Sequence, residues 1–330
     1  MSPTEGKVLV TGGRGFIGTH LVSALARARW DVTSVDVAPL SARTDASVRE
    51  VVLDIRDADG VARLFREHAF ETVFDLAACT EVGLPKPKYQ RNIDATRTMI
   101  EAIGTSSVRK YIFFSTQFVF RKPDQTPASE EDFFPVDNYA ASKVASERAI
   151  RASLPSERYL ILRPTYIWGP GLRRFKDGLL YRLAKGQLLI SSNPAMVRYY
   201  GYVKTAAAQA MALARLDFAA LPRRVYYLSD DAVTLREFCA PLIAALGQGR
   251  AIAVPPALIR GLGVAGSALG NFGLTAPINM LQARELTRNY PVPIAPTIEM
   301  THEVTDLYAA AAETVAWAKA DARWLAKIAP

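Results

Sequence analysis

The chain has few cysteines, few histidines and no long apolar run. Its two cysteines, Cys79 and Cys239, exclude a disulfide framework and indicate a reducing compartment, so we expect a cytoplasmic protein. The three histidines, His20, His68 and His302, lack the spacing of metal ligands, so we expect no metal site. No uninterrupted apolar stretch reaches the roughly 20 residues of a membrane-spanning helix, and the polar first residues predict no signal peptide.

Charge is unbalanced but scattered. The chain has 40 lysines and arginines against 32 acidic residues, a formal net charge of +8. No basic run typical of a nucleic-acid-binding tail occurs, so we expect no nucleic-acid partner. Two small basic groups stand out, Arg121-Lys122 and the Arg173, Arg174 and Lys176 group. Each is compatible with a solvated surface or with attraction of an anionic substrate such as a diphosphate.

The first half of the chain alternates short β-branched runs with helical patterns. This alternation is typical of βαβ units and a parallel sheet. Strands are expected over residues 7–11, 31–36, 49–53, 72–76, 110–115 and 159–163, and helices over 15–29, 92–103 and 139–152. Because such units wind right-handed, they predict an α/β fold with a Rossmann-type, doubly wound parallel sheet.

Beyond Pro164 the alternation loosens. We expect a helix over 203–216, a strand over 225–228, a helix over 234–246 and a last helix over roughly 303–326. The helix at 234–246 begins with a capping box, because Thr234 is followed three residues later by Glu237. We expect residues 1–167 and 203–228 to form the sheet domain, and residues 168–202 and 229–330 to form a smaller C-terminal α/β lobe closing over its edge.

A glycine fingerprint, Gly12-x-x-Gly15-x-x-Gly18, follows the first expected strand and opens a helix. Gly12 allows the tight turn, and Gly15 lets the backbone approach a pyrophosphate. Gly18 permits close packing of helix on strand, and the helix N-terminus supplies N–H groups and positive potential. This arrangement predicts a dinucleotide site.

The choice of dinucleotide depends on Asp36, which ends the second expected strand. A carboxylate there accepts hydrogen bonds from both ribose hydroxyls and repels a 2′-phosphate, so we predict NAD as the cofactor. Arg14 and Arg43 leave NADP as the alternative, because a guanidinium can clamp that phosphate.

A possible proton-transfer centre lies in Tyr139-Ala-Ala-Ser-Lys143. On a helix, residues four apart share one face. A phenol with a pKa of about 10 is a poor base at neutral pH, but a nearby ammonium stabilises the phenolate. We therefore expect Tyr139 to act as the base and Lys143 to lower its pKa and hold the nicotinamide ribose. Ser115 or Thr116, at a strand end, would orient the substrate oxygen.

These motifs together resemble the extended short-chain dehydrogenase/reductase superfamily, and more closely its NAD-dependent nucleotide-sugar epimerase/dehydratase branch. The resemblance covers residues 8–231 and then weakens. It is carried by Thr11-Gly-Gly-Arg-Gly-Phe-Ile-Gly18, Asp54-Ile55, Leu76-Ala-Ala78, Asn92-Ile-Asp-Ala-Thr96, Ser115-Thr-Gln-Phe-Val-Phe120, Leu162-Arg-Pro-Thr-Tyr-Ile-Trp-Gly-Pro170 and Arg198-Tyr-Tyr-Gly-Tyr-Val203.

The resemblance implies a role for each matching residue. It selects Thr116 over Ser115 as the catalytic hydroxyl, beside Tyr139 and Lys143. For substrate it implies Thr116, Gln117 and Arg198, the last gripping a diphosphate. It also implies a homodimer through the helices at 92–103 and 139–152. For the cofactor it implies Gly12, Gly15, Phe16, Ile17, Asp36, Asp54, Ile55, Leu76, Ala77, Ala78, Asn92, Tyr139, Lys143 and Pro164.

Departures from the family narrow the chemistry. Sugar dehydratases of this branch carry Asp-Glu after the catalytic threonine, where this chain has Gln117 and Phe118. Neither side chain can transfer that proton, so water elimination is disfavoured. Related decarboxylases place glutamate where Phe118 stands, so decarboxylation is disfavoured too. Lys204-Thr205 replaces the usual Asp-Asp, and residues 279–301 lack the common C-terminal motif.

Three functions fit these residues. The first is an NAD-dependent epimerase or oxidoreductase acting on a hydroxyl or keto carbon of a nucleotide diphosphate sugar. The second is an oxidoreductase of the 3β-hydroxysteroid dehydrogenase type, since residues 251–281 carry few charges and are typical of an apolar pocket, of packed core or of a helix seated at a membrane surface. The third is a dinucleotide-sensing regulator without catalysis, which the intact Thr116, Tyr139 and Lys143 set disfavours.

Overall fold

The computed structural model describes residues 5–39, 46–81, 83–271 and 278–329. Arg43, the alternative ligand for a 2′-phosphate, lies outside the described residues. None of the described helices is both long and apolar enough to cross a membrane.

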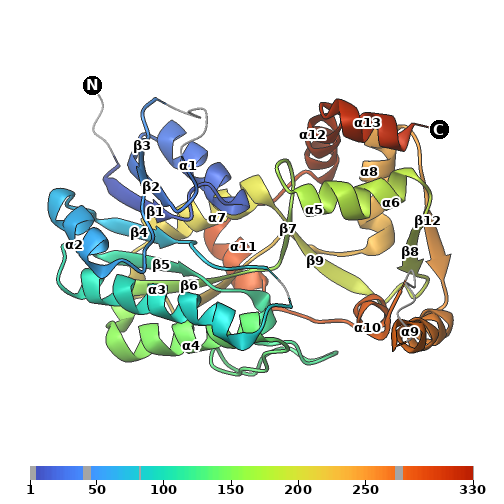
Figure 1. The fold of residues 1–330 in the computed structure, drawn as a ribbon, viewed down its shortest axis with the longest axis horizontal. Helices are drawn as coiled ribbons and strands as arrows, with labels where there is room; N and C mark the ends of the chain where they lie inside the picture. Colours follow the sequence, from blue (N-terminus) through green and yellow to red (C-terminus); the bar gives the residue numbers. More distant parts are fainter. Residues whose placement is uncertain (1–4, 40–45, 82, 272–277, 330) are drawn as a thin grey trace.

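A seven-stranded parallel sheet forms the larger half of the molecule (Figure 1). Its strands lie in the order β10-β6-β5-β4-β1-β2-β3, so the sequence winds outward in both directions from β1. The predicted doubly wound sheet is confirmed, with strand ends shifted by one residue at most. The strands are β1 (Lys7–Thr11), β2 (Asp31–Asp36), β3 (Arg49–Val52), β4 (Thr72–Asp75), β5 (Lys110–Phe114), β6 (Tyr159–Pro164) and β10 (Val225–Leu228).

Helices cover both faces of this sheet, as the apolar sequence of β5 requires. Ile112 and Phe114 pack with α1 (Phe16–Arg27) and α7 (Val203–Arg215), while Tyr111 and Phe113 pack on the other face. That second face is covered by α2 (Ala58–Glu67), α3 (Lys86–Gly104) and α4 (Asn138–Ser153). Successive side chains of a strand point to opposite faces, so a strand buried on both sides is apolar throughout.

A smaller lobe lies beyond the carboxyl end of the sheet, to the right in Figure 1. Its core surrounds Trp168 and Phe238, whose rings meet edge to face at 5.0 Å. Two small sheets, missed from the sequence, belong to this lobe. One comprises β7 (Tyr166–Trp168), β9 (Val197–Tyr202) and β11 (Ala232–Thr234), and the other β8 (Leu188–Ser191) and β12 (Ala251–Val254).

The helices of the lobe correct one prediction and refine others. The single helix expected over residues 303–326 is wrong, because the structure has α12 (Leu307–Lys319) and α13 (Ala322–Ile328). Asp321 separates them by accepting hydrogen bonds from the first amides of α13. The capping box of Thr234 and Glu237 at α8 (Leu235–Leu246) is confirmed. The remaining helices are α5 (Arg173–Phe175), α6 (Tyr181–Ala184), α9 (Pro256–Asn271), α10 (Met280–Thr287) and α11 (Ala295–Thr301).

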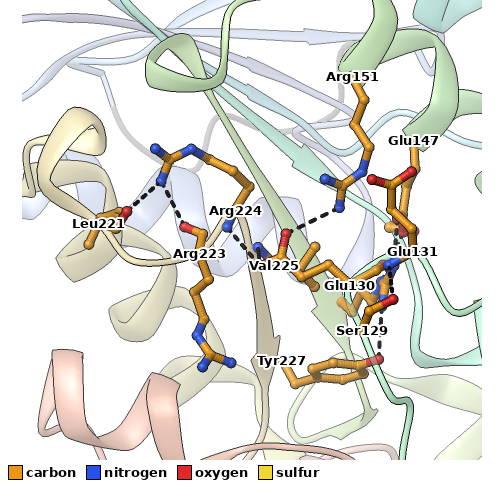
Figure 2. Close-up of polar contacts among 12 residues, drawn as sticks. Ser129, Glu130, Glu131, Glu147, Arg151, Leu221, Arg223, Arg224, Val225 and Tyr227 are labelled. Atoms are coloured by element: carbon orange, nitrogen blue, oxygen red, sulfur yellow. Dashed lines mark hydrogen bonds and ion pairs between the residues drawn. The ribbon is translucent and has the colours of Figure 1, made fainter.

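Glu130 fastens the loop before α4 to the edge of the large sheet (Figure 2). Its Oε1 accepts hydrogen bonds from the backbone amides of Arg224 (2.8 Å) and Val225 (3.1 Å) at the start of β10. Its Oε2 lies 3.4 Å from the guanidinium of Arg151 on α4. The Glu130 carbonyl accepts a 2.6 Å bond from Arg163 on β6. One side chain thus joins the loop, the helix and the outermost strand.

Candidate functional site

A cavity of about 600 Å³ opens at the carboxyl ends of β1, β2 and β4. This edge is where open parallel sheets bind ligands. Most of the predicted cofactor residues line it. They are Gly12, Gly15, Phe16, Ile17, Asp36, Asp54, Ile55, Leu76, Ala77, Ala78 and Asn92.

The glycine turn at the floor of the cavity leaves no room for side chains. Gly12 has a φ of 65°, and a Cβ there would lie 2.9 Å from the backbone nitrogen of Ala77. A Cβ on Gly18 would lie 2.1 Å from the carbonyl oxygen of Gly12. Because backbone atoms cannot yield as a flexible side chain does, only glycine fits both positions. The turn therefore presents bare backbone toward the cavity, as a pyrophosphate requires.

Asp36 reaches the cavity with a carboxylate fixed by two backbone amides. Its Oδ2 accepts from Arg14 N and its Oδ1 from Ala38 N, both at 3.0 Å. A carboxylate has about four lone-pair positions, so acceptor capacity remains for ribose hydroxyls. The Arg14 guanidinium bonds to the Ala38 carbonyl and pairs with Glu50 at 3.5 Å. Its charge is thus largely compensated without a 2′-phosphate.

Two further polar residues shape the cavity wall. The Asp54 carboxylate is bonded by the Arg56 side chain at 3.0 and 3.1 Å, which lowers the pKa of Asp54. Asn92 on α3 accepts a 2.8 Å bond from the Cys79 amide and donates to the Cys79 carbonyl and to Ser142 on α4. Asn92 therefore holds the backbone after β4 against both helices.

Thr116 and Tyr139 meet at the end of β5. Thr116 directly follows the strand and is buried, and Tyr139 lies in the first turn of α4, where Asp137 caps the helix. Burial raises the pKa of Tyr139 to about 12, and the Asp137 charge adds to this rise. The charge of Arg174 and a hydrogen bond from Thr116 act in the opposite direction. Arg174, expected only as part of a basic group, therefore favours the phenolate, but the pKa of Tyr139 is raised overall, contrary to the expected lowering by Lys143.

Lys143 is buried one turn further along α4. Its ammonium donates a 2.7 Å hydrogen bond to the Phe114 carbonyl at the end of β5 and lies 4.5 Å from the centre of the Phe113 ring. Burial lowers the pKa of Lys143 to about 8, while the nearby charges of Asp75 and Glu147 oppose that fall. Lys143 thus titrates near physiological pH.

Asp75, which sequence reasoning missed, is a buried carboxylate at the end of β4. It accepts hydrogen bonds from Thr11 Oγ1 (2.5 Å) and from the Tyr111 hydroxyl (2.6 Å). Thr11 Oγ1 in turn accepts from the amides of Leu76 and Ala77, both at 3.1 Å. Burial raises the pKa of Asp75. The sequence did contain a signal for this residue. Asp75 is an acid at the end of an otherwise apolar strand, immediately before Leu76 of the Leu-Ala-Ala motif.

A second buried network also escaped prediction. Glu147 on α4 accepts from Arg163 Nε at 3.0 Å and Arg163 Nη2 at 2.6 Å, and both side chains are fully buried. Ser115 donates a 2.5 Å bond to the same carboxylate. This network connects β5 and β6 to α4 beneath Lys143. The Ser115 hydroxyl is therefore engaged in a structural hydrogen bond with Glu147.

Beyond Thr116 the site is walled by aromatic rings around a buried cation. The Arg121 side chain is 4% exposed and lies 3.8 Å from the centre of the Tyr290 ring. It donates to the Tyr166 hydroxyl at 2.7 Å and pairs with Glu285 of α10. Arg121 is therefore no solvated surface residue. Gln117, next to Thr116, is buried, and its amide nitrogen has no partner among the described residues.

Arg198 and Pro164 lie outside the cavity lining, as do Tyr139, Lys143, Thr116 and Gln117. Pro164 ends β6 beside Leu228 of β10. The Arg198 guanidinium is buried and donates to its neighbour Val197's carbonyl at 2.7 Å and to the Glu285 carbonyl. The Arg198 guanidinium, which was expected to bind a diphosphate, is thus hydrogen-bonded to backbone oxygens instead.

Comparison with known proteins bears on these motifs. Residues 8–227 match the family model described as the NAD dependent epimerase/dehydratase family. The chain belongs to this family. The resemblance drawn from the motifs is confirmed, and the matched residues span the large sheet from β1 to β10.

The relatives that resemble this chain are named for different activities. A UDP-glucose 4-epimerase of Drosophila melanogaster is 28% identical over 174 residues, which are 46% of this chain and 49% of the relative. The chain thus spans about half the length of that epimerase. A 3 beta-hydroxysteroid dehydrogenase/Delta 5-->4-isomerase of Mycobacterium tuberculosis strain H37Rv is 26% identical over 268 residues, 74% of this chain and 70% of the relative.

Solved structures share the fold over nearly the whole chain. MoeE5 in complex with UDP-glucose and NAD has a TM-score of 0.70 at 22% identity, covering 96% of this chain and 100% of that one. The UDP-glucose 4-epimerase of Thermus thermophilus, in complex with NAD, has a TM-score of 0.69 at 24% identity, covering 96% and 99%. At this identity the likeness concerns the fold.

Proposed function

We propose that the chain is an NAD-dependent epimerase or oxidoreductase that acts on a hydroxyl or keto carbon of a nucleotide diphosphate sugar. One observation carries the proposal: a proton-transfer pair, Thr116 and Tyr139, lies at the carboxyl end of β5, on the same edge of the sheet as the cavity at the ends of β1, β2 and β4. The bare glycine turn and the spare acceptor capacity of Asp36 fit NAD, and the compensated charge of Arg14 disfavours NADP.

In this proposal the protein positions the substrate and moves one proton. Tyr139 takes the proton from the substrate hydroxyl in its phenolate form, which its burial disfavours, while Thr116 hydrogen-bonds the same oxygen. Arg174 stabilises the phenolate electrostatically. Lys143, held between helix and strand, supplies an ammonium for the ribose of the cofactor. NAD, when bound, supplies the hydride exchange at the same carbon.

The fate of the keto intermediate decides the reaction class. If it turns within the pocket before hydride returns, the net reaction is epimerisation. If it leaves, the reaction is that of a dehydrogenase or, in reverse, a ketoreductase. Gln117 and Phe118, which cannot relay a proton for elimination, exclude the dehydratase reaction from the proposal.

A second candidate, an oxidoreductase of the 3β-hydroxysteroid dehydrogenase type, is favoured by a specific observation. Arg198 donates to two backbone carbonyls, and the nearby Arg121 is enclosed by rings and paired with Glu285. Neither cation is free for a diphosphate in this arrangement. The rings of Phe118, Tyr166 and Tyr290 around Arg121 suit an apolar alcohol better than a nucleotide.

Calorimetric binding, followed by NADH absorbance for net oxidation and by product analysis for epimerisation, separates the candidates. The NAD-loaded protein is titrated with UDP-, GDP- and dTDP-sugars and with a 3β-hydroxysteroid, and each ligand that binds is then assayed for turnover. We expect binding and turnover with one class of nucleotide sugar. Turnover of the steroid alone would favour the second candidate, and NAD binding without any turnover would favour a sensor.

Three expectations remain predictions at this point. They are the domain division at residues 167, 203 and 228, a homodimer through α3 and α4, and a cytoplasmic location. Limited proteolysis, sedimentation and cell fractionation check them in turn.

A further inference from the structure

Helix α9 exposes apolar side chains where surface helices of globular proteins carry charge. Between Pro256 and Leu269 its one charged residue is Arg260. Leu258 is 55% exposed, Leu262 39% and Leu269 43%. A helix that is apolar all round is normally buried on every side, so its outer face lacks a covering.

The packing of α9 shows which face is outermost. Its inner face holds Ile259, which is fully buried, and Gly263, where a Cβ would lie 2.4 Å from the Cβ of Ala283 on α10. Leu258, Leu262 and Leu269 are spaced by four and seven residues, so they line one flank of the exposed face, about a quarter turn from the buried row, and Arg260 lies on the opposite flank. They form a ridge about 16 Å long at a rise of 1.5 Å per residue.

This ridge lies at the periphery of the small lobe. Figure 1 shows α9 and α10 side by side at the end of the molecule remote from the outer strands of the large sheet, and their packing is close. Leu281, at the start of α10, is 69% exposed and adds a fourth large apolar side chain to this pair of helices.

The charge around these helices is of one sign. Residues 238–284 contain no aspartate or glutamate and three arginines, of which Arg260 lies on α9 and Arg284 on α10, while Arg250 lies beside Gly186 after α6. All three are exposed, and none has a carboxylate partner in the part of the chain that the structure describes. The next acid, Glu285, is paired with Arg121. Apolar side chains beside uncompensated cations complement an anionic, apolar-cored surface.

We propose that α9 and α10 dock on an anionic lipid membrane, with the leucines of α9 inserted at the headgroup boundary along one flank and with Arg260, on the other flank, and Arg284 of α10 facing lipid phosphates. A second copy of the chain is a poorer occupant. In a two-fold interface the same patch meets itself, so the arginines of the two copies would approach one another. An anionic lipid surface satisfies both the apolar ridge and the charge.

Sedimentation with vesicles tests this surface without reference to catalysis. The full-length protein is mixed with vesicles of phosphatidylcholine alone or with phosphatidylglycerol added, at low and high salt. We expect binding to the anionic vesicles at low salt and release at high salt, because exposed charges are screened. Each arginine near an anionic surface contributes roughly fivefold in affinity.

Paired variants locate the contact. The double variant Leu258→Gln/Leu262→Gln should bind anionic vesicles about 25-fold more weakly, at roughly fivefold for each half-exposed leucine. Arg260→Gln should weaken binding roughly fivefold. Leu325→Gln on α13 and Arg66→Gln on α2 are matched controls, since Leu325 is 44% exposed and both residues lie on other parts of the molecule, and both should bind like the wild type. Circular dichroism verifies folding of each variant.

Three results would overturn the proposal. They are no vesicle binding at low salt, equal losses in the α9 variants and the matched controls, and a wild-type dimer in solution that the double leucine variant converts to monomer. The last would assign the ridge to contact between copies of the chain.

Discussion

The cofactor cavity and the reaction centre around Tyr139 and Lys143 are built by different means. The cavity beside the glycine turn is shaped by backbone: Gly12 and Gly18 exclude Cβ atoms, and the amides of Arg14 and Ala38 fix the Asp36 carboxylate. The reaction centre is shaped by buried side chains instead, with Lys143 of α4 buried against the end of β5. Backbone suits a constant diphosphate, whereas buried titratable groups allow proton affinities to be adjusted.

This difference predicts different effects of substitutions in the two regions. A substitution in the cofactor cavity should lower cofactor affinity, and a substitution in the reaction centre should lower turnover or shift its pH dependence.

The largest effect is expected from Tyr139→Phe. Removing the hydroxyl removes the proposed proton acceptor, and such groups contribute about 10²–10⁴-fold. We expect kcat to fall about a thousandfold, with the Kd for NAD changed by less than about threefold, as measured by stopped-flow turnover and calorimetry. Tyr308→Phe, at an exposed position on α12, serves as the control and should keep wild-type turnover. Full turnover by the Tyr139 variant would refute the scheme.

Next in size is Gly18→Ala. Its Cβ would lie 2.1 Å from the Gly12 carbonyl oxygen, so the turn must open and lose at least one amide hydrogen bond to a phosphate. Such a bond to a charged group is worth about 1.5–3 kcal/mol, and we expect the Kd for NAD to rise about ten- to hundredfold by calorimetry. Gly104→Ala, where a Cβ meets nothing within 4 Å, is the matched control. Unchanged NAD affinity in Gly18→Ala would show that this turn does not hold the cofactor.

A smaller effect is expected from Asp36→Asn. The amide loses the charge that repels a 2′-phosphate and one charge-assisted hydrogen bond to ribose. The ratio of NADP to NAD affinity should rise about tenfold in parallel titrations. A wild-type protein that already prefers NADP would contradict the role given to Asp36 and to the Arg14–Glu50 pair.

The smallest effect, Asp75→Asn, tests the reaction centre's electrostatics. Lys143 acts while protonated and Tyr139 while deprotonated, so kcat/KM should rise with pH, bend at the Lys143 pKa of about 8 and level off up to the Tyr139 pKa of about 12. Asp75 raises the pKa of Lys143, and its removal should move this bend to lower pH by about one unit. Rate profiles against pH measure the shift. An unmoved bend would mean that Asp75 carries no charge near Lys143.

The large sheet was predictable because its signals are local. Each strand has its own apolar run. The spacing of the three glycines locates the turn that follows β1 at the carboxyl end of the sheet. The three-stranded sheet of the lobe was missed because β7 and β11 have three residues each and β9 pairs with both of them across distant parts of the chain. Local periodicity also joined α12 and α13 into one helix, since it does not register the capping by Asp321.

The candidate site was predictable only as far as its motifs extend. Tyr139 and Lys143 were paired by helical spacing, yet the structure turns Lys143 toward the Phe114 carbonyl. Asp75 accepts a hydrogen bond from Tyr111, which is 36 residues away in sequence, and Arg121 pairs with the distant Glu285. Partners this far apart in sequence meet only through tertiary packing.

The link between Arg121 and Glu285 has a consequence for how the protein is made. The two residues are 164 positions apart, and domains fold from the N-terminus as the chain emerges from the ribosome. Until α10 is synthesised, Arg121 has no counter-charge from Glu285, and water must solvate it at the open edge of the nascent sheet. The aromatic wall around it therefore closes late.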